Sequence, residues 1–258
     1  MISASQLSKY VYCPRSLYLT GWLKIADPIT DDKTRGLLGH AIRKEFSLRQ
    51  TKILENLREK EIREAFELEL ENVIQDAPYI YRQTLPEGFQ RFLPKIKKEV
   101  EAEIRLMERK LDSMISQLGF EEALTKLTPW QVEYNVKSTE LGLKGRIDKV
   151  MREEHIYPVE IKTGKPAKSV WPGDRIQVSA YSLLLEEKFS QEIPFGFVEY
   201  TREYVKKPVM NTEKLRRQVL DVRDKCIKIS EGYDPGVCPH GSHKKCVGCA
   251  LEELCYKT

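Results

Sequence analysis

The sequence has no apolar run approaching the roughly 20 residues needed to cross a membrane. Its first residues lack the basic and apolar regions of a secretory signal, and no G-x4-G-K-[ST] phosphate loop is present. We therefore expect a cytoplasmic protein with no membrane partner and no nucleotide-driven motor of its own. Cysteine is scarce, with six residues among 258, and a reducing cytosol disfavours disulfides between them.

An excess of charge of one sign is also missing. The chain carries 43 basic and 39 acidic side chains, for a formal net charge of +4. This balance neither requires nor excludes a nucleic-acid partner, because local patches of charge matter more than the total. The length suits one domain with a sizeable core.

Two carboxylates in the middle of the chain have the spacing of a β-hairpin. The stretch GRIDKVMREEHIYPVEIKTGKP contains two segments with Val, Ile and Tyr around a polar turn at residues 152–155. If the hairpin closes symmetrically, Asp148 and Glu160 lie opposite each other on one face, with Cβ atoms about 5 Å apart. Since side chains alternate along a strand, Lys162 shares the face of Glu160.

This trio suits the hydrolysis of a phosphodiester. Two carboxylates so close together repel each other unless a cation lies between them, and Mg²⁺ or Mn²⁺ prefers such oxygen ligands. The ion lowers the pKa of a coordinated water and neutralises a phosphate oxygen, while Lys162 orients the nucleophile or stabilises the transition state. The alternative is a surface hairpin with scattered charges, because charged residues make up 32% of the sequence.

Two further segments carry candidates for the same site. Gln177 and Tyr181 are four residues apart in a helix predicted after Asp174, so their amide and phenol can reach the carboxylates or a DNA phosphate. His40 lies in TRGLLGHAIRKEF, where the apolar spacing predicts a helix, and imidazole is an ordinary ligand for Mn²⁺. The alternatives are a half-buried tyrosine beside a solvated glutamine, and a histidine that only packs.

Most of the cysteines lie near the two ends of the chain. Cys13 lies in SKYVYCPRSLYL, and a C-x2-C-x5-C pattern comprises Cys246, Cys249 and Cys255. Three thiolates are one short of a tetrahedral or cubane metal site, and Cys13 can supply the fourth. The sequence therefore predicts a metal site that joins the two ends.

Zinc is the competing metal for this segment. Cys238, His240 and His243 lie just upstream of the three cysteines, so a mixed Cys/His zinc site can be drawn from residues 238–255 alone. Cys226 lies among apolar residues at helical intervals, and we expect it to be a small core residue instead of a ligand.

The rest of the pattern predicts a mixed α/β protein. Apolar residues step by threes and fours between Pro94 and Gly119, and again through residues 53–73, which predicts two amphipathic helices. Residues 78–94 contain three prolines and are expected to form an irregular connection. From Trp130 onward the pattern predicts a strand, a hairpin, a helix, two further strands, and a final helix that ends before Gly232.

In their order along the chain, the motifs His40, Asp148, Glu160-x-Lys162 and Gln177-x3-Tyr181 resemble those of the PD-(D/E)XK nucleases, in the RecB-like branch. The resemblance implies a restriction-endonuclease-like mixed sheet flanked by helices. It also implies a metal held by the side chains of His40, Asp148 and Glu160 and by the main-chain carbonyl of Ile161, with Lys162 serving catalysis. Gln177 and Tyr181 match the motif that follows the active strand.

One cysteine before the nuclease core and three after it resemble the iron-sulfur members of this branch, including the AddB type and the small CRISPR-associated exonucleases. The resemblance implies a [4Fe-4S] cluster on Cys13, Cys246, Cys249 and Cys255. It further implies a DNA exonuclease that digests single-stranded DNA or single-stranded ends, often from the 5′ end. In that family the enzyme works with CRISPR integrase proteins in spacer acquisition, a part of antiviral defence.

Two alternatives stay open: a viral or archaeal recombination and repair nuclease with the same site, and a cluster-bearing DNA-binding subunit without catalysis. The oligomeric state is left open as well. We expect a single nuclease domain, 1–258. Within it we distinguish an N-terminal segment (1–44), a helical insertion (45–128), the nuclease core (129–232) and a C-terminal cysteine segment (233–258).

Overall fold

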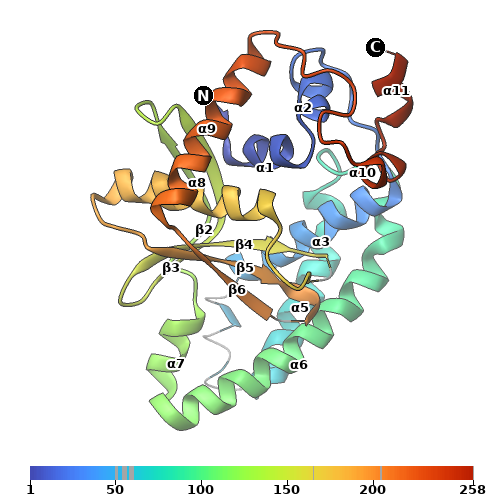
Figure 1. The fold of residues 1–258 in the computed structure, drawn as a ribbon. Helices are drawn as coiled ribbons and strands as arrows, with labels where there is room; N and C mark the ends of the chain where they lie inside the picture. The colour runs from blue at the N-terminus through green and yellow to red at the C-terminus, as the bar shows by residue number, and fades with distance from the viewer. Residues whose placement is uncertain (50–51, 54–56, 58–60, 165, 204, 258) are drawn as a thin grey trace.

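Within the part of the chain that the structure describes, a six-stranded mixed sheet forms the centre of the protein (Figure 1). The computed structural model describes residues 1–49, 52–53, 57, 61–164, 166–203 and 205–257. The main path of the sheet runs in the order β1-β3-β4-β5-β6, and β2 pairs with β3. The strands are β1 (Ile2–Ser3), β2 (Gln131–Ser138), β3 (Leu143–Arg152), β4 (Ile156–Lys162), β5 (Phe195–Tyr200) and β6 (Val205–Met210).

The pairing directions follow from the connections. Short links join β2 to β3 and β3 to β4, and both pairs are antiparallel. The link from β4 to β5 contains α8 (Pro172–Phe189), and these two strands are parallel, as a crossover helix requires. A short 3-10 turn, η2 (Thr201–Glu203), leads from β5 into the antiparallel β6. The mixed α/β fold predicted from the sequence is confirmed.

Helix α8 lies across one face of the sheet and is covered in turn by α1 (Ala4–Tyr12) and α9 (Glu213–Ser230) (Figure 1). A helix between two layers must be apolar or small all round. Residues 176–182 of α8 are accordingly all buried, including Ser179 and Ser182. Ser179 Oγ is bonded to Asn211 Oδ1 at 2.6 Å, and Ser182 Oγ donates to the Val178 carbonyl, so neither buried hydroxyl is left unpaired.

A second, largely helical layer lies on the other side of the sheet, where the long α6 runs diagonally in Figure 1. Its apolar side chains, among them Leu38, Phe66 and Ile104, form a core of their own. The helices of this layer are α3 (Asp31–Leu48), α5 (Ile62–Ile80), η1 (Phe89–Phe92), α6 (Leu93–Leu118) and α7 (Phe120–Leu127). At the end of α6, Gly119 has a φ of 83°, a backbone conformation that favours glycine.

The C-terminal segment of the chain lies beside α2 (Pro14–Gly21), which follows α1 directly. The C-terminal helices α10 (His243–Val247) and α11 (Glu252–Lys257) lie next to it in Figure 1. Lys245 Nζ donates to the Tyr12 carbonyl at 2.8 Å, which fixes α10 to the end of α1. Among the residues described, no helix combines the length and the apolar character needed to cross a bilayer.

The helical layer differs from the sequence prediction at Pro78, at η1 within the connection expected to be irregular, and at α7, which was not predicted. Helix α5 runs through Pro78 to Ile80, whereas an irregular connection was expected from residue 78. Ala77 and Tyr81, on either side of the last turn, are buried in the core of this layer, and their packing offsets the hydrogen bond that proline cannot donate. Part of the helix predicted over 53–73 lies outside the described residues, and the described helix begins at Ile62.

Candidate active site

The β3–β4 hairpin has the register predicted from the sequence. Lys149 pairs with Val159 and Arg152 with Ile156, so Asp148 and Glu160 follow as the next opposite positions. At this position the side chain of Asp148, instead of a main-chain group of β3, bonds to the main chain of β4. The main-chain N–H of Ile161 donates to Asp148 Oδ2 at 2.7 Å. The hairpin therefore brings both carboxylates to its open end, and both are buried.

A gap in the sheet lies next to these carboxylates. One edge of β3 pairs with β1 at Leu143 and Lys144 and with β4 from Lys149 onward. Between these partners, residues 145–148 have no strand partner on that edge in the described part of the chain. Strands β1 and β4 thus diverge at the position where Asp148 lies, and the main chain of β3 is accessible there to side chains from α8.

Gln177 and Tyr181 fill this gap from α8. Tyr181 Oη donates to the Arg146 carbonyl at 3.0 Å, and Gln177 Nε2 donates to Tyr181 Oη at 2.9 Å. The tyrosine ring passes so close to Gly145 that an added Cβ would lie 2.6 Å from a ring carbon. Burial, reinforced by the carboxylates of Glu160 and Asp148, raises the pKa of Tyr181 well above its usual value. The neutral phenol thus supports the floor of the site.

Glu160 and Lys162 project from β4 on the same side. Lys162 Nζ lies 2.9 Å from Glu160 Oε1 and 3.2 Å from Asp174 Oδ1. Burial alone would lower the pKa of Lys162, but these two carboxylates raise it, and the ammonium stays charged. Burial and then the nearby Asp148 raise the pKa of Glu160 from 4.5 to about 7. Among the described residues, the buried Glu160 Oε2 has no hydrogen-bond partner, and an unpaired buried carboxylate oxygen can accept a cation.

His40 reaches the same carboxylates from α3. Its Nε2 lies 3.1 Å from Asp148 Oδ1. Burial lowers the pKa of His40, but the hydrogen bond to Asp148 and the charges of Asp148, Glu160 and Glu133 together more than offset that effect, so the net pKa is raised. Each of His40, Glu133 and Asp148 offers one ligand atom, and these atoms all lie within 4.8 Å of one another. Imidazole and carboxylate donors at this spacing fit a hard divalent cation.

Glu133 is the member of this group that the sequence analysis missed. Its backbone has a φ of 53°, a left-handed conformation that is uncommon outside glycine. Beside it, β3 loses its regular alternation: Ile147 packs in the core under α8, whereas Lys149, two residues on, lines a cavity beneath α6. Nothing in the stretch QVEYNV marks either distortion, so only the structure places Glu133 at the site.

An open cleft of about 750 Å³ leads to these groups. His40, Asp148 and Glu160 line it together with Gln177 and Tyr181. Its other walls come from the start of α1, from Leu37 on α3 and from strands β2 and β3. A substrate therefore has access to the carboxylates from solvent, although the carboxylates themselves are buried.

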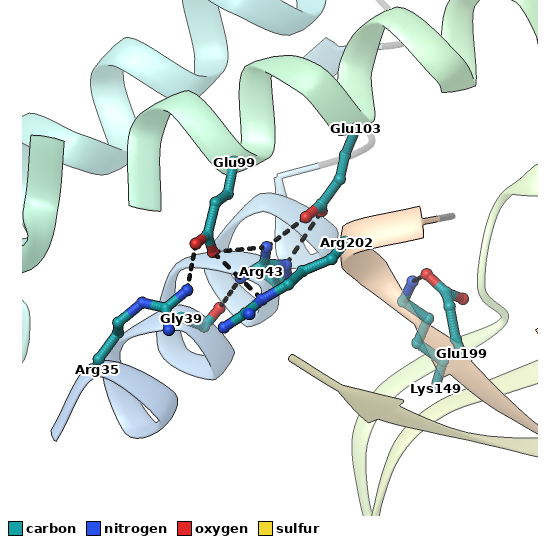
Figure 2. A network of polar contacts seen from close by, with 8 residues as sticks. All are labelled: Arg35, Gly39, Arg43, Glu99, Glu103, Lys149, Glu199 and Arg202. Carbon is teal, nitrogen blue, oxygen red and sulfur yellow. Dashed lines mark hydrogen bonds and ion pairs between the residues drawn. The ribbon is translucent and has the colours of Figure 1, made fainter. Parts of the chain in front are cut away.

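Figure 2 shows the ion pairs that hold α3, the helix that carries His40, against α6. Arg43 Nε donates to Glu103 Oε2 at 3.0 Å, and Arg43 Nη1 donates to the Gly39 carbonyl at 2.9 Å. A second carboxylate of α6, that of Glu99, lies 3.8 Å from Arg43 Nη2. Because Arg43 follows His40 by one helical turn, this buried network fixes the rotation of α3 at the position of the histidine.

The cysteines predicted to form a metal site line one small cavity between α2 and the C-terminal helices. Cys13, Cys246, Cys249 and Cys255 all contribute to its wall, and burial raises the pKa of the Cys13 thiol. These four thiols on two distant segments fit a thiolate-ligated metal group.

Two other possible ligands line the same cavity. Cys238 Sγ lies 3.4 Å from Cys246 Sγ, and His240 Nε2 lies 3.9 Å from the same Cys246 sulfur. His243, the third member of the alternative zinc set, is not among the lining residues described. Cys226 is buried in the core between α1, α8 and α9, where it contacts the Gln6 carbonyl.

Comparison with known proteins gives a consistent picture. The sequence pattern of the PD-(D/E)XK nuclease superfamily matches residues 1–256. The chain is 44% identical over 64 residues to a CRISPR-associated exonuclease Cas4/endonuclease Cas1 fusion of Myxococcus xanthus, a match that covers 22% of this chain and 11% of that protein.

The chain also resembles two proteins described as DNA replication ATP-dependent helicase/nuclease DNA2. The human protein is 25% identical over 246 residues, which cover 87% of this chain and 22% of that protein. The protein of Gallus gallus is 35% identical over 103 residues, which cover 36% of this chain and 10% of that protein. The matched region is thus less than a quarter of the length of any of these three relatives.

Proposed function

Because this chain belongs to the PD-(D/E)XK nuclease superfamily, we propose that it is a metal-dependent deoxyribonuclease, an exonuclease that digests single-stranded DNA from the 5′ end. The observation that carries the proposal is the convergence of His40, Asp148 and Glu160 in one open cleft, with the charged Lys162 lying 2.9 Å from Glu160. Phosphodiester hydrolysis needs both a cation site and a positive group for the charge that develops on phosphate, and these four side chains offer both.

Each side chain has a distinct role in the proposed reaction. His40, Asp148, Glu160 and the Ile161 carbonyl hold Mg²⁺ or Mn²⁺, with Glu133 beside them. When bound, the ion supplies Lewis-acid chemistry at the phosphate. Lys162, held between two carboxylates, keeps its proton and directs its ammonium toward the reacting phosphate or the attacking water. Gln177 and Tyr181 maintain the main chain of β3 beneath these groups.

The cysteine cavity is proposed to hold a [4Fe-4S] cluster on Cys13, Cys246, Cys249 and Cys255. This assignment is supported by the meeting of these four thiols in one cavity. Since the ligands come from both ends of the chain, the cluster constrains the unfolded chain and its role is structural. A zinc ion that uses Cys238 and His240 is the competing occupant, because both side chains lie close to Cys246.

The proposed biological role is the processing of DNA ends for CRISPR spacer acquisition, together with an integrase. The similarity to a protein described as a fusion of Cas4 and Cas1 supports this role. A second candidate role lies in DNA replication or repair, and the similarity to the human helicase/nuclease over 87% of this chain supports it. Both roles use the same nuclease site.

The reaction class is tested with end-labelled DNA. The purified chain is incubated with single-stranded and duplex DNA in Mg²⁺, Mn²⁺ or chelator, and the products are sized over time. We expect metal-dependent shortening of the single strand from its 5′ end. Glu160→Ala should abolish cleavage and retain DNA binding, and Lys162→Ala should slow turnover by at least about tenfold with metal affinity retained.

Glu154→Gln is the matched control, because Glu154 lies exposed in the turn of the same hairpin. It should cleave at the wild-type rate. Cleavage by Glu160→Ala at the wild-type rate would remove the catalytic assignment. Internal cuts without shortening from an end would replace the exonuclease by an endonuclease.

A further inference from the structure

Two lysines face each other across β2 and β3. Lys137 and Lys144 are direct partners in the antiparallel register of these strands. Like charges in directly opposite positions destabilise a sheet, and both residues are exposed. Among the ion pairs of the described residues, neither lysine has a carboxylate within 4.0 Å. The protein thus keeps an unfavourable pair that its own acidic side chains do not neutralise.

The pair lies on the wall of the active-site cleft. Leu143 and Ile147 of β3 belong to the core under α8, so Lys144 and Arg146, which alternate with them, face the opposite side. Asn135 pairs with Arg146 as Lys137 pairs with Lys144, which gives two adjacent polar pairs on this wall. Arg146 is 63% exposed although its Nε lies 2.9 Å from Glu133.

Acidic and basic side chains therefore lie in different parts of the cleft. The carboxylates of Asp148 and Glu160 lie buried at one end beside His40, where a cation is needed. The two lysines lie further along β2 and β3, and four residues of an extended strand separate Lys144 from Asp148 by about 13 Å. When one phosphate of a polyanion lies at the cation site, other phosphates of the same molecule can reach a positive group at that distance.

We propose that Lys137 and Lys144 form a phosphate-binding pair that holds the DNA backbone next to the cleaved bond, so that the strand follows β2 and β3 away from the metal groups. This inference rests on the proposed nuclease function and specifies where its substrate lies. Bound phosphates neutralise the repulsion between the lysines, which explains why an unfavourable pair is kept at this position. The contacts are to the backbone, so they carry no sequence preference.

The test measures DNA binding without cleavage. Binding of a fluorescein-labelled oligothymidylate is followed by anisotropy in chelator and in Ca²⁺, over a series of salt concentrations. For Lys137→Ala/Lys144→Ala we expect weaker binding and a salt slope reduced by about 1.4, since each phosphate contact on a single strand contributes about 0.7. The melting temperature should not fall, because the variant removes a repulsion and no packing.

Lys225→Ala/Lys228→Ala is the matched control. These two exposed lysines lie one turn apart on α9, outside the cleft, and their removal changes the net charge by the same amount. The control should keep the wild-type salt slope. A cleft variant with the wild-type slope, or a control with an equal loss, would overturn the inference.

The binding assay stands apart from the nuclease assay. If the wild-type chain bound DNA with the expected slope but cleaved none in Mg²⁺ or Mn²⁺, the proposed function would fail while the lysine pair stood. If cleavage were normal and the lysine variant bound normally, only the phosphate-binding pair would fail. Hydrolysis of a small chromogenic phosphodiester should be equal in wild type and in Lys137→Ala/Lys144→Ala, because that substrate does not reach the pair, and a loss there would contradict the inference.

Discussion

The carboxylate of Asp148 accepts a 2.7 Å hydrogen bond from the main-chain N–H of Ile161 and lies 3.1 Å from the imidazole of His40. One oxygen, Oδ2, thus completes the pairing of β3 with β4, while the other, Oδ1, faces the histidine of α3. The side chain that we assign to the metal is therefore also the link between hairpin and helix. Its structural and catalytic roles can be separated by two substitutions.

Asp148→Asn should lose activity but keep the fold. The amide oxygen can still accept from Ile161, whereas the loss of charge should lower kcat/KM by at least about 100-fold. Asp148→Ala should lose activity to the same extent and also destabilise the metal-free protein by about 1–3 kcal/mol, because a buried N–H loses its partner. Urea unfolding of the two variants measures the difference. Equal stabilities would mean that the hydrogen bond to Ile161 does not support the hairpin.

Stabilisation by Mg²⁺ should increase with pH. The pKa of Glu160 is raised from 4.5 to about 7 in the folded protein, so its proton stabilises the metal-free fold below pH 4.5 and this contribution is lost as pH rises through about 7. Mg²⁺ requires the ionised form. The rise in melting temperature on adding Mg²⁺ should therefore be larger at about pH 8 than at about pH 6.

Two protons compete with the metal, one on Glu160 and one on His40, and Glu160→Gln removes the first. The raised pKa of His40 acts in the same direction as that of Glu160, because imidazolium repels a cation. In the variant, the smaller Mg²⁺ effect that remains should follow His40 alone. If the rise in melting temperature that Mg²⁺ gives in the wild type did not depend on pH over this range, protonation of these groups would not compete with metal binding.

Arg43→Ala should be among the most damaging changes outside the cleft. It leaves the buried carboxylate of Glu103 without its partner, and removal of one member of a buried pair costs about 3–5 kcal/mol. The double variant Arg43→Met/Glu103→Leu should recover most of this stability, because no unpaired charge remains. Urea unfolding measures both. The double variant should nevertheless bind Mg²⁺ more weakly, since the network that orients α3 at His40 is gone.

Arg63→Ala is the control for this pair. Arg63 joins α5 to α6 through Glu108, but half of its side chain is exposed. Its loss should change stability little, because solvent screens the pair. If Arg63→Ala and Arg43→Ala lost stability equally, burial of the Arg43 pair would not be the reason for the larger effect.

The sequence was sufficient for the hairpin because two local rules act on it together. The positions of the polar turn and of the Val, Ile and Tyr residues set the register, and the register aligns Asp148 with Glu160. The helices from Pro94 to Gly119 and after Thr212 were predictable for a similar reason, since their apolar spacing and caps are local. The mixed α/β fold followed from the order of these elements.

The remainder of the site depends on tertiary geometry. Glu133 lies close to His40 at a point where its own backbone has a positive φ and where the side chains of β3 switch faces, and no residue type in this stretch encodes either feature. The gap that Tyr181 fills exists because β1 and β4 pair with different parts of β3. The sequence likewise showed the thiol of Cys238 but not its 3.4 Å approach to Cys246.

Glu133→Gln should weaken metal binding without unfolding the protein. Glutamine keeps the size and the φ of the residue but removes the charge next to His40 and Asp148. We expect the affinity for Mn²⁺, measured by calorimetry on the wild type and the variant, to fall by about tenfold or more, as for other groups around a metal site. Glu140→Gln, in the exposed turn between β2 and β3, is the control. Unchanged Mn²⁺ affinity in Glu133→Gln would exclude Glu133 from the site.

The colour and metal content of the wild type and of cysteine variants should show which thiols hold the metal. Anaerobically purified wild-type protein should be brown, with broad absorption near roughly 400 nm from thiolate-ligated iron. Cys13→Ser should lose the iron and also stability, because the link between the two ends of the chain is lost. Cys226→Ser should keep its iron, since this thiol, whose pKa burial raises to about 12, lies in the core away from the cavity.

Cys238→Ser decides between the two metals, because a cluster on Cys13, Cys246, Cys249 and Cys255 does not need Cys238. Colourless wild-type protein with stoichiometric zinc that Cys238→Ser abolishes would replace the cluster by the mixed zinc site.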